Sequence, residues 1–497
     1  MARRGEMQEV ELLDGAADDG HGSGPTPEAT GRMRVRRRRL IAGAAVLAVT
    51  LGVVQWVTTA RENAALARLS HVPGVLSPID ANLDVVRRVP SADVGALVGS
   101  TGAGLKHGDD GSQSYTWVNP AGGSPGWTTE LLGPNDTLAG AGHVFGGSDC
   151  RTDEEPGTDS GTAHRVVCLV TDGGMLLDGT GGREDIPATT RQVVVLSTTG
   201  GGVEARWPLE RGQSLALLPD DVVVVGSMTA DSVAVTAYDV LTGTERWTHE
   251  EPLPTQAGDA QGAMGISLFR AGDLIAYSTP SGSLTLLSAD GDVVRDHLGE
   301  RSDAGWGLTT DPTTGALIVQ TQTADGRSRS TFIAVDGDPA GDLTVDGQLV
   351  YASVDDGSVP GLMVTYDTSL HGWDAHTGAA RWSHDAYLTT GALILRGRIY
   401  AATSQGVIAL DGRTGESLWS SQGKDRFTGA LFTDGRHVFL ALEAVGTDTT
   451  PVLVAYDPVS GDEAFRAQYP AGTSPVGEVD RRLMGYDAAT DEYVLLG

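Results

Sequence analysis

Short runs of apolar or alternating residues recur between residues 84 and 497, and glycine-rich turns separate them. Three of the clearest are DVVVVGSM, GALILRGRIYAAT and RHVFLALEA, at Asp221–Met228, Gly391–Thr403 and Arg436–Ala444. Runs of this length that are rich in branched apolar residues and bounded by turn residues are typical of β-strands. The pattern predicts an all-β domain made of many short strands.

A turn motif repeats within this domain. The pattern apolar–Asp–x–x–Thr/Ser–Gly–x–x–x–Trp/Phe occurs at Ala237–Trp247, Gly372–Trp382, Ala409–Trp419 and Ala455–Phe465. Degenerate copies occur at Trp117–Trp127, Val195–Trp207 and Leu286–Val294, and near Ile333–Gly337. In each clear copy we expect the aspartate to accept backbone hydrogen bonds and the glycine to supply the positive φ that a reversal needs. The predicted turn pairs are Asp239 with Gly243, Asp374 with Gly378, Asp411 with Gly415, and Asp457 with Gly461.

The repeat also predicts how the strands are arranged. Each copy, with the strand before it, forms an antiparallel sheet of about four strands, and one such sheet cannot bury both of its faces. Packing the sheets around a channel does bury them, which gives a β-propeller. Eight copies predict an eight-bladed propeller over residues 84–497, with seven blades as the alternative. We expect Val476–Leu496 to complete the first blade and close the ring.

The motif ALDxxTGxxxW at Ala409–Trp419 resembles the repeat of pyrroloquinoline-quinone-like propellers, the quinoprotein alcohol dehydrogenase-like superfamily. The resemblance covers roughly residues 74–497 and implies that the aromatic residue of each copy docks between neighbouring blades. The residues that would take this role are Trp207, Trp247, Trp382, Trp419 and Phe465. The segment VPGVLSPID at Val72–Asp80 is similar to membrane-anchored propellers of high-GC Gram-positive bacteria.

A single long apolar segment precedes the repeats. Leu40–Ala60 holds 21 residues without a formal charge, and a helix of that length spans roughly the 30 Å hydrocarbon core of a bilayer. The block at residues 32–39 includes Arg36, Arg37, Arg38 and Arg39, which predicts that the N-terminus is cytoplasmic and the repeats are extracytoplasmic. Residues 1–31 are acidic and poor in apolar side chains, which predicts a disordered cytoplasmic tail. Residues 61–83 would form a juxtamembrane linker.

Two other interpretations of this segment stay open. A cleaved signal peptide would have a shorter apolar region and a better cleavage site than Thr58-Thr59-Ala60. A twin-arginine signal could use Arg37 and Arg38. The interpretation that we favour is a retained helix in the plasma membrane.

The net charge limits the classes of partner that the chain can bind, and the cysteine content indicates its cellular compartment. The formal net charge is −30, which argues against a nucleic-acid partner because binding phosphates needs a concentrated basic face. The only two cysteines, Cys150 and Cys168, both follow the apolar segment. Disulfides persist outside the cell, so we expect these two cysteines to form a disulfide that closes a long hairpin loop. The C-x-x-C spacing of a redox pair is missing.

The resemblance also implies a quinone, a Ca²⁺ ion and a disulfide between adjacent cysteines. The two cysteines here are 18 residues apart, and no stretch carries the calcium ligands and the aspartate base of those dehydrogenases, so we predict neither cofactor and no enzymatic activity. The acids between Asp336 and Asp346 break the pattern of an EF-hand loop. The three histidines His371, His376 and His384 lack a ligand pattern.

These observations predict a non-catalytic, membrane-anchored propeller outside the cell, which serves as a protein-interaction or cell-envelope scaffold. Its predicted partners are the lipid bilayer, through residues 40–60, and extracytoplasmic proteins. The alternatives are a quinone-binding dehydrogenase-like propeller and a propeller that binds carbohydrate or another ligand.

Overall fold

The structure is a computed structural model. It describes residues 62–497 with gaps at 63, 92–102, 119–124, 137, 140–143, 146, 154–162, 178–182, 230, 254–264, 280–283, 299–305, 312–313, 323–325, 422–428 and 444–449. The chain divides into two compact units, Met1–Ala67 and Arg68–Gly497. Within the described ranges, no helix has the length and apolar character that crossing a membrane would require. The predicted tail, arginine block and membrane helix, at 1–31, 32–39 and 40–60, lie outside the described residues.

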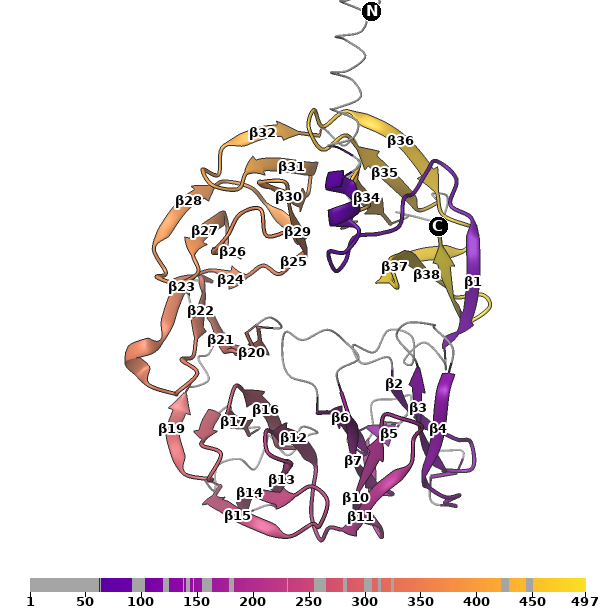
Figure 1. Cartoon of the computed structure of the whole chain (residues 1–497), viewed down its shortest axis with the longest axis vertical. Helices are drawn as coiled ribbons and strands as arrows, with labels where there is room; N and C mark the ends of the chain where they lie inside the picture. The colour runs from indigo at the N-terminus through magenta and orange to yellow at the C-terminus, as the bar shows by residue number, and fades with distance from the viewer. Residues whose placement is uncertain are drawn as a thin grey trace, which may run out of the picture. The chain divides into compact units, whose positions relative to one another are not determined.

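The second unit is built from small, almost entirely antiparallel β-sheets (Figure 1). Strands in the middle of a sheet are buried along most of their length, because other sheets cover both faces; β7, Arg165–Thr171, is an example. Strands at an outer edge alternate between exposed and partly buried positions, as β15, Glu245–Pro252, does. The 3₁₀ turn η2, Pro339–Gly341, is a short helical element within this unit.

Three sheets form from the first part of this unit. They are β2–β3–β4 (Ala103–His107, Gln113–Val118, Pro125–Leu132), β6–β7–β10–β11 (Asp149–Thr152, Arg165–Thr171, Arg191–Ser197, Val203–Pro208) and β5–β8–β9 (Val144–Phe145, Gly174–Leu177, Arg183–Ile186). The small sheet β5–β8–β9 uses strands that lie between β4 and β10 in the sequence, so it is an insertion into the regular repeat.

Three regular four-stranded sheets follow along the chain. They are β12–β13–β14–β15 (Ser214–Leu218, Val222–Met228, Ser232–Asp239, Glu245–Pro252), β16–β17–β18–β19 (Ser267–Ala271, Leu274–Ser278, Leu284–Leu287, Val293–Leu298) and β20–β21–β22–β23 (Trp306–Thr310, Leu317–Gln322, Ser328–Phe332, Leu343–Asp346). In each of them the strand order follows the sequence, so every neighbouring pair is joined by a local connection.

The remaining sheets include one departure from this order. They are β24–β26–β27–β28 (Gln348–Leu349, Leu362–Tyr366, Leu370–Asp374, Ala380–His384), β25–β29–β30–β31–β32 (Ala352–Asp355, Leu388–Leu395, Arg398–Thr403, Gly406–Asp411, Ser417–Ser420) and β33–β34–β35–β36 (Gly429–Thr433, Val438–Leu442, Val452–Tyr456, Glu463–Gln468). Strand β25 leaves its own sheet and pairs in parallel with β29 of the next sheet, which makes that sheet five-stranded.

The two ends of the repeat region share a sheet. The C-terminal strands β37 (Thr473–Val479), β38 (Arg482–Asp487) and β39 (Glu492–Leu496) are completed by β1 (Val85–Pro90), which pairs antiparallel with β39. The expected pairing of Val476–Leu496 with the start of the domain is therefore present. However, β2–β4 form a sheet of their own, so the C-terminal strands do not complete the sheet that holds the first copy of the motif.

Core clusters between consecutive sheets hold them together. One cluster combines Val167 with Leu217 and Val223, from the sheets of β7 and of β12–β13. Another combines Phe439 with Leu483 and Val494, from the sheets of β34 and of β38–β39. Packing of each sheet on its neighbours is what a β-propeller requires. The predicted number of eight blades is not confirmed, because ten sheets lie in the described part of the chain.

The segment before β1 is bound to the sheets at the other end of the chain. Val75 forms a parallel bridge with Thr433, and the Leu76 amide donates to the carbonyl of Thr433 at 2.8 Å. The Ser77 amide donates to the carbonyl of Arg481, also at 2.8 Å. Val75 and Leu76 are each only 1% exposed. The second half of the predicted linker, 61–83, is thus an integral part of the folded unit.

Candidate interaction surface

The four repeat turns share one hydrogen-bond pattern. In the first, the Asp239 carboxylate accepts the Thr242 amide at 2.9 Å and the Leu241 amide at 3.2 Å, and the Gly243 amide donates to the Asp239 carbonyl at 2.9 Å. These bonds favour the charged carboxylate, so the Thr242 amide first of all lowers the pKa of Asp239, to about 2. The carboxylates of the other three clear copies, Asp374, Asp411 and Asp457, accept the amides at the same two offsets.

Each glycine of these turns has a positive φ and also lies beneath a side chain from the preceding sheet. Gly415 has a φ of +70°, and a Cβ built on it would lie 2.7 Å from Cδ2 of Trp382. Trp382 comes from β28, and its Nε1 donates to the Gly412 carbonyl of the next turn at 3.1 Å. The glycine is therefore needed twice, for its backbone conformation and for the space that the indole ring occupies.

This contact recurs in one direction along the chain. The tryptophan that covers each turn glycine belongs to the preceding sheet in the pairs Trp127 with Gly201, Trp207 with Gly243, Trp247 with Gly291, Trp382 with Gly415, and Trp419 with Gly461. The indole N–H groups of Trp127, Trp207, Trp247 and Trp419 donate to the carbonyls of Thr198, Val240, Ala289 and Pro458 at 2.7–3.1 Å. Four of these five residues, Trp207, Trp247, Trp382 and Trp419, are predicted docking tryptophans, and each contacts a turn of the next sheet. Trp127 makes the same contact but was not among the predicted docking residues.

Two sheets use aliphatic side chains for the same contact. Val294 covers Gly337, and Leu343 covers Gly378, the turn glycine of a clear copy. Val294 and Leu343 belong to the two sheets that hold the motif copies without a tryptophan, at Leu286–Val294 and near Ile333–Gly337. Phe465 packs differently, with its ring centroid 5.3 Å from that of His437 and 6.2 Å from that of Phe439. The sequence pattern does not show the aliphatic substitutes, because a valine or leucine in a strand is unremarkable.

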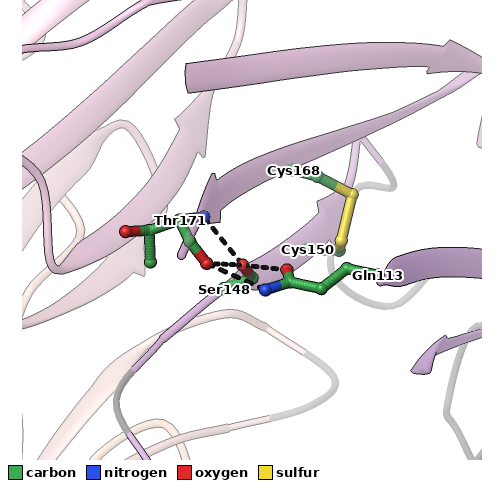
Figure 2. The surroundings of a disulfide bond; sticks show 5 residues. All are labelled: Gln113, Ser148, Cys150, Cys168 and Thr171. Carbon is green, nitrogen blue, oxygen red and sulfur yellow. Dashed lines mark hydrogen bonds between the residues drawn. A yellow bond between two sulfur atoms is a disulfide. The ribbon is translucent and has the colours of Figure 1, made fainter. Parts of the chain in front are cut away.

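The predicted disulfide is present and lies at the edge of a sheet. Cys150 on β6 faces Cys168 on β7 directly across the ladder, with a Cα–Cα distance of 4.0 Å. Figure 2 shows the polar group beside it: Ser148 donates to Gln113 Oε1 at 2.5 Å and accepts the Thr171 amide at 2.9 Å. Gln113 in turn donates to the Thr171 carbonyl at 2.8 Å. These side chains satisfy one another, which indicates a structural role.

The acids and histidines considered as metal ligands are dispersed. Asp342 pairs with Arg295 at 2.8 Å, and Asp338 accepts the Ala340 amide at 2.9 Å. His371 Nε2 lies 3.1 Å from Asp367 Oδ1, whereas the other two histidines take no part in that contact. Across the ranges that the structure describes, no three or more His, Cys, Asp or Glu side chains are grouped so that they could hold a metal ion.

A groove of about 170 Å³ lies where three consecutive sheets meet. Its apolar lining includes Val167 of β7, Leu217 of β12, Val222 of β13 and Val240 after β14. The charged residues of the lining are Asp153, Arg165, Asp220, Asp221 and Arg270. The sequence did not indicate this site, because its residues come from separate repeats and share no motif.

The predicted membrane-orienting residues Arg36, Arg37, Arg38 and Arg39 lie outside the described residues. Nothing in the folded unit places them, so the predicted topology stays a prediction.

Comparison with known proteins gives a family match. The sequence model of the family described as outer membrane protein assembly factor BamB, a PQQ-like repeat family, matches residues 112–421, more than half of the chain. No curated protein matches. Among solved structures, BamB from Moraxella catarrhalis is 17% identical, covers 62% of this chain and 93% of its own, and has a TM-score of 0.34. A europium-containing methanol dehydrogenase is 11% identical, with coverages of 68% and 84% and a TM-score of 0.31. A eukaryotic initiation factor is 9% identical, with coverages of 80% and 90% and a TM-score of 0.41.

Proposed function

Because the chain belongs to the PQQ-like repeat family described as outer membrane protein assembly factor BamB, we propose that it is a non-catalytic scaffold that binds other proteins in the cell envelope. The observation that carries this proposal is the contact between an aromatic or aliphatic side chain and the turn glycine of the next sheet, which recurs at seven junctions between consecutive sheets in the described part of the chain. A rigid scaffold of this kind presents its hairpins and loops as fixed binding surfaces.

We place the folded unit outside the cytoplasm, anchored by a helix over residues 40–60. The apolar segment and the arginine block support this location. The disulfide between Cys150 and Cys168 supports it independently, because disulfides persist in oxidising compartments and are rare in the cytosol.

The described residues do not fit a quinone site of the kind that the resemblance implies. The chain has two cysteines only, and they are joined across β6 and β7 and are not adjacent in sequence. No group of possible metal ligands is formed among the described side chains. We therefore propose no step that depends on a quinone at these residues.

The scaffold proposal is tested by proximity labelling in cells. A labelling enzyme is fused after Gly497 of the full chain, and the control carries the same enzyme after residues 1–67 alone, which is the first compact unit. We expect a reproducible set of envelope proteins that the full chain labels and the control does not. Labelling identical to that of the control would contradict a scaffold. Purified full chain that carried a stoichiometric quinone and reduced a redox dye would contradict the absence of catalysis.

A carbohydrate-binding role is the second candidate, and one exposed tyrosine that packs on a partly buried one favours it. Tyr387 is 69% exposed, and its ring lies edge-on to that of Tyr366, with centroids 6.5 Å apart. Nearby in sequence, Ser369 donates to the exposed Asp385 at 3.0 Å. Tyrosine rings flanked by polar groups suit the apolar faces and hydroxyls of sugars. Retention of the chain on immobilised cell-wall glycan, lost in Tyr387→Ala, would favour this function over the first.

A further inference from the structure

The groove at the junction of three sheets has an apolar floor. Leu217 and Val222 are each 8% exposed, Val240 is 2% exposed and Val167 is 1% exposed. The Val240 amide donates to the Asp221 carbonyl at 2.9 Å, which fixes the turn after β14 against the β12–β13 hairpin. At about 170 Å³ the groove holds the volume of about six water molecules at ~30 Å³ each. That is enough for one long side chain, but it is well below the roughly 300–1,000 Å³ of small-molecule sites.

Two carboxylates that line the groove have oxygen atoms without a hydrogen-bond partner among the described residues. Asp220 and Asp221 form the tip of the β12–β13 hairpin, with φ values of +60° and +58°. The carboxylate of Asp220 has no partner among the described residues. Asp153 accepts the His164 and Arg165 amides at 2.8 and 3.1 Å through Oδ1 alone. Its second oxygen makes no bond within the described part of the chain.

The two arginines at the groove do not reverse this charge. Arg165 is already held between two carboxylates: its Nε donates to Glu204 at 2.8 Å, and its Nη1 pairs with Asp221. Arg270 donates through Nε to the Gly272 carbonyl at 2.9 Å. Arg246 of β15 donates to the Asp220 carbonyl at 3.2 Å and pairs with Asp239 at 3.0 Å. Counting this pair and Glu204 with the five charged lining residues gives five carboxylates against three arginines, on a protein whose net charge is −30.

We propose that this groove binds a lysine or arginine side chain from an extended segment of a partner protein. The aliphatic stem would lie on the floor, and the cationic group would reach the carboxylate of Asp220, which is the way such side chains divide between apolar surface and water. An acidic segment would meet the carboxylates of the groove, and a purely apolar one would leave them unused. The inference rests on the proposed scaffold function and names the chemistry of one of its partners.

The test uses purified full chain and a phage-displayed library of random heptapeptides. We expect the selected peptides to be enriched in lysine or arginine beside an apolar residue. Binding of the synthetic consensus peptide should weaken about two- to fivefold in Asp220→Asn, the range expected for an exposed ion pair, and further in Asp220→Lys. Asparagine tolerates a positive φ at least as well as aspartate, so a loss in Asp220→Asn is not a loss of folding. Asp480→Asn is the matched control, because Asp480 is exposed at the tip of the β37–β38 hairpin and has a φ of +48°.

Each alternative outcome has a definite meaning. Peptides without a basic residue, or equal binding to the wild type and Asp220→Asn, would overturn the groove proposal. Acidic peptides that bind less well to Arg270→Gln would show that Arg270 is the receptor, which also overturns it. The proximity-labelling result does not depend on this groove, so a scaffold that binds its partners elsewhere would be recognised as such.

Discussion

Replacing Gly415 with alanine should destabilise the protein by about 2–5 kcal/mol, and Gly397 offers a matched control. Both glycines have a positive φ, +70° and +76°, so alanine at either position costs about 1–2 kcal/mol of backbone strain. The two differ in their surroundings. A Cβ on Gly415 would lie 2.7–2.8 Å from three atoms of the Trp382 ring, whereas a Cβ on Gly397 would meet no heavy atom within 4 Å.

The difference between these two variants measures the contact between consecutive sheets. Overpacking typically costs about 1–3 kcal/mol, which adds to the strain at Gly415 and not at Gly397. The assay is urea unfolding of the purified protein, with the dependence on denaturant compared between variants to verify that the same surface is exposed. Equal destabilisation by the two substitutions would refute the argument that the indole ring occupies the space above Gly415.

A double-mutant cycle separates the ring from the backbone. Trp382→Ala should itself cost about 3–5 kcal/mol, as the loss of a large buried aromatic does. In that variant the additional Gly415→Ala change should cost only the strain of about 1–2 kcal/mol, because the ring is no longer there. An unchanged cost of Gly415→Ala in the absence of Trp382 would show that the two residues do not interact.

Three further predictions concern the disulfide, acid stability and the membrane. The Cys168→Ser variant should lose about 3 kcal/mol of stability, as expected for a closed loop of this size. Peptide mapping of the unreduced wild-type protein should find Cys150 linked to Cys168, and two free thiols would contradict the disulfide. Because the pKa of Asp239 is lowered to about 2, its contribution to stability is complete above the unfolded pKa of about 4 and is lost as the pH falls towards 2. The free energy of unfolding, measured from pH 5 to 2, should therefore depend less on pH in Asp239→Asn than in the wild type. Identical pH profiles would contradict this prediction. Alkaline carbonate should leave the full chain in the membrane fraction and release a variant without residues 40–60, and release of both would contradict a retained helix.

The fold class follows from local physical chemistry and could be predicted. A short run rich in valine and bounded by turn residues, such as Asp221–Met228, favours a buried strand, and β13 occupies Val222–Met228 of that run. The disulfide was predictable for a similar reason, because the chain has no other cysteines. The family match over residues 112–421 agrees with the repeat pattern.

The number of sheets could not be predicted in this way, because the inserted sheet β5–β8–β9, the five-stranded sheet and the C-terminal sheet all depart from the repeat. Strand β25 pairs in parallel with β29, although it follows the short strand β24 of the preceding sheet after only two residues. No local pattern distinguishes a strand that stays in its sheet from one that crosses to the next. The C-terminal strands likewise form a sheet with β1 without any copy of the full motif.

The groove could not be predicted from the sequence, because its proposed preference for a basic side chain depends on which carboxylates already accept hydrogen bonds within the fold. The clear repeat turns place Asp239, Asp374, Asp411 and Asp457 on the surface, yet each carboxylate accepts the amides of its own turn. Their charge contributes to the acidic field of the protein, but their hydrogen-bonding capacity is largely committed to the fold. Asp220 belongs to a hairpin that needs no such bond from its side chain, and it stands beside an apolar floor. A strongly acidic chain therefore does not bind basic partners equally over its whole surface. Binding energy can be concentrated where a carboxylate without a partner lies beside buried apolar side chains.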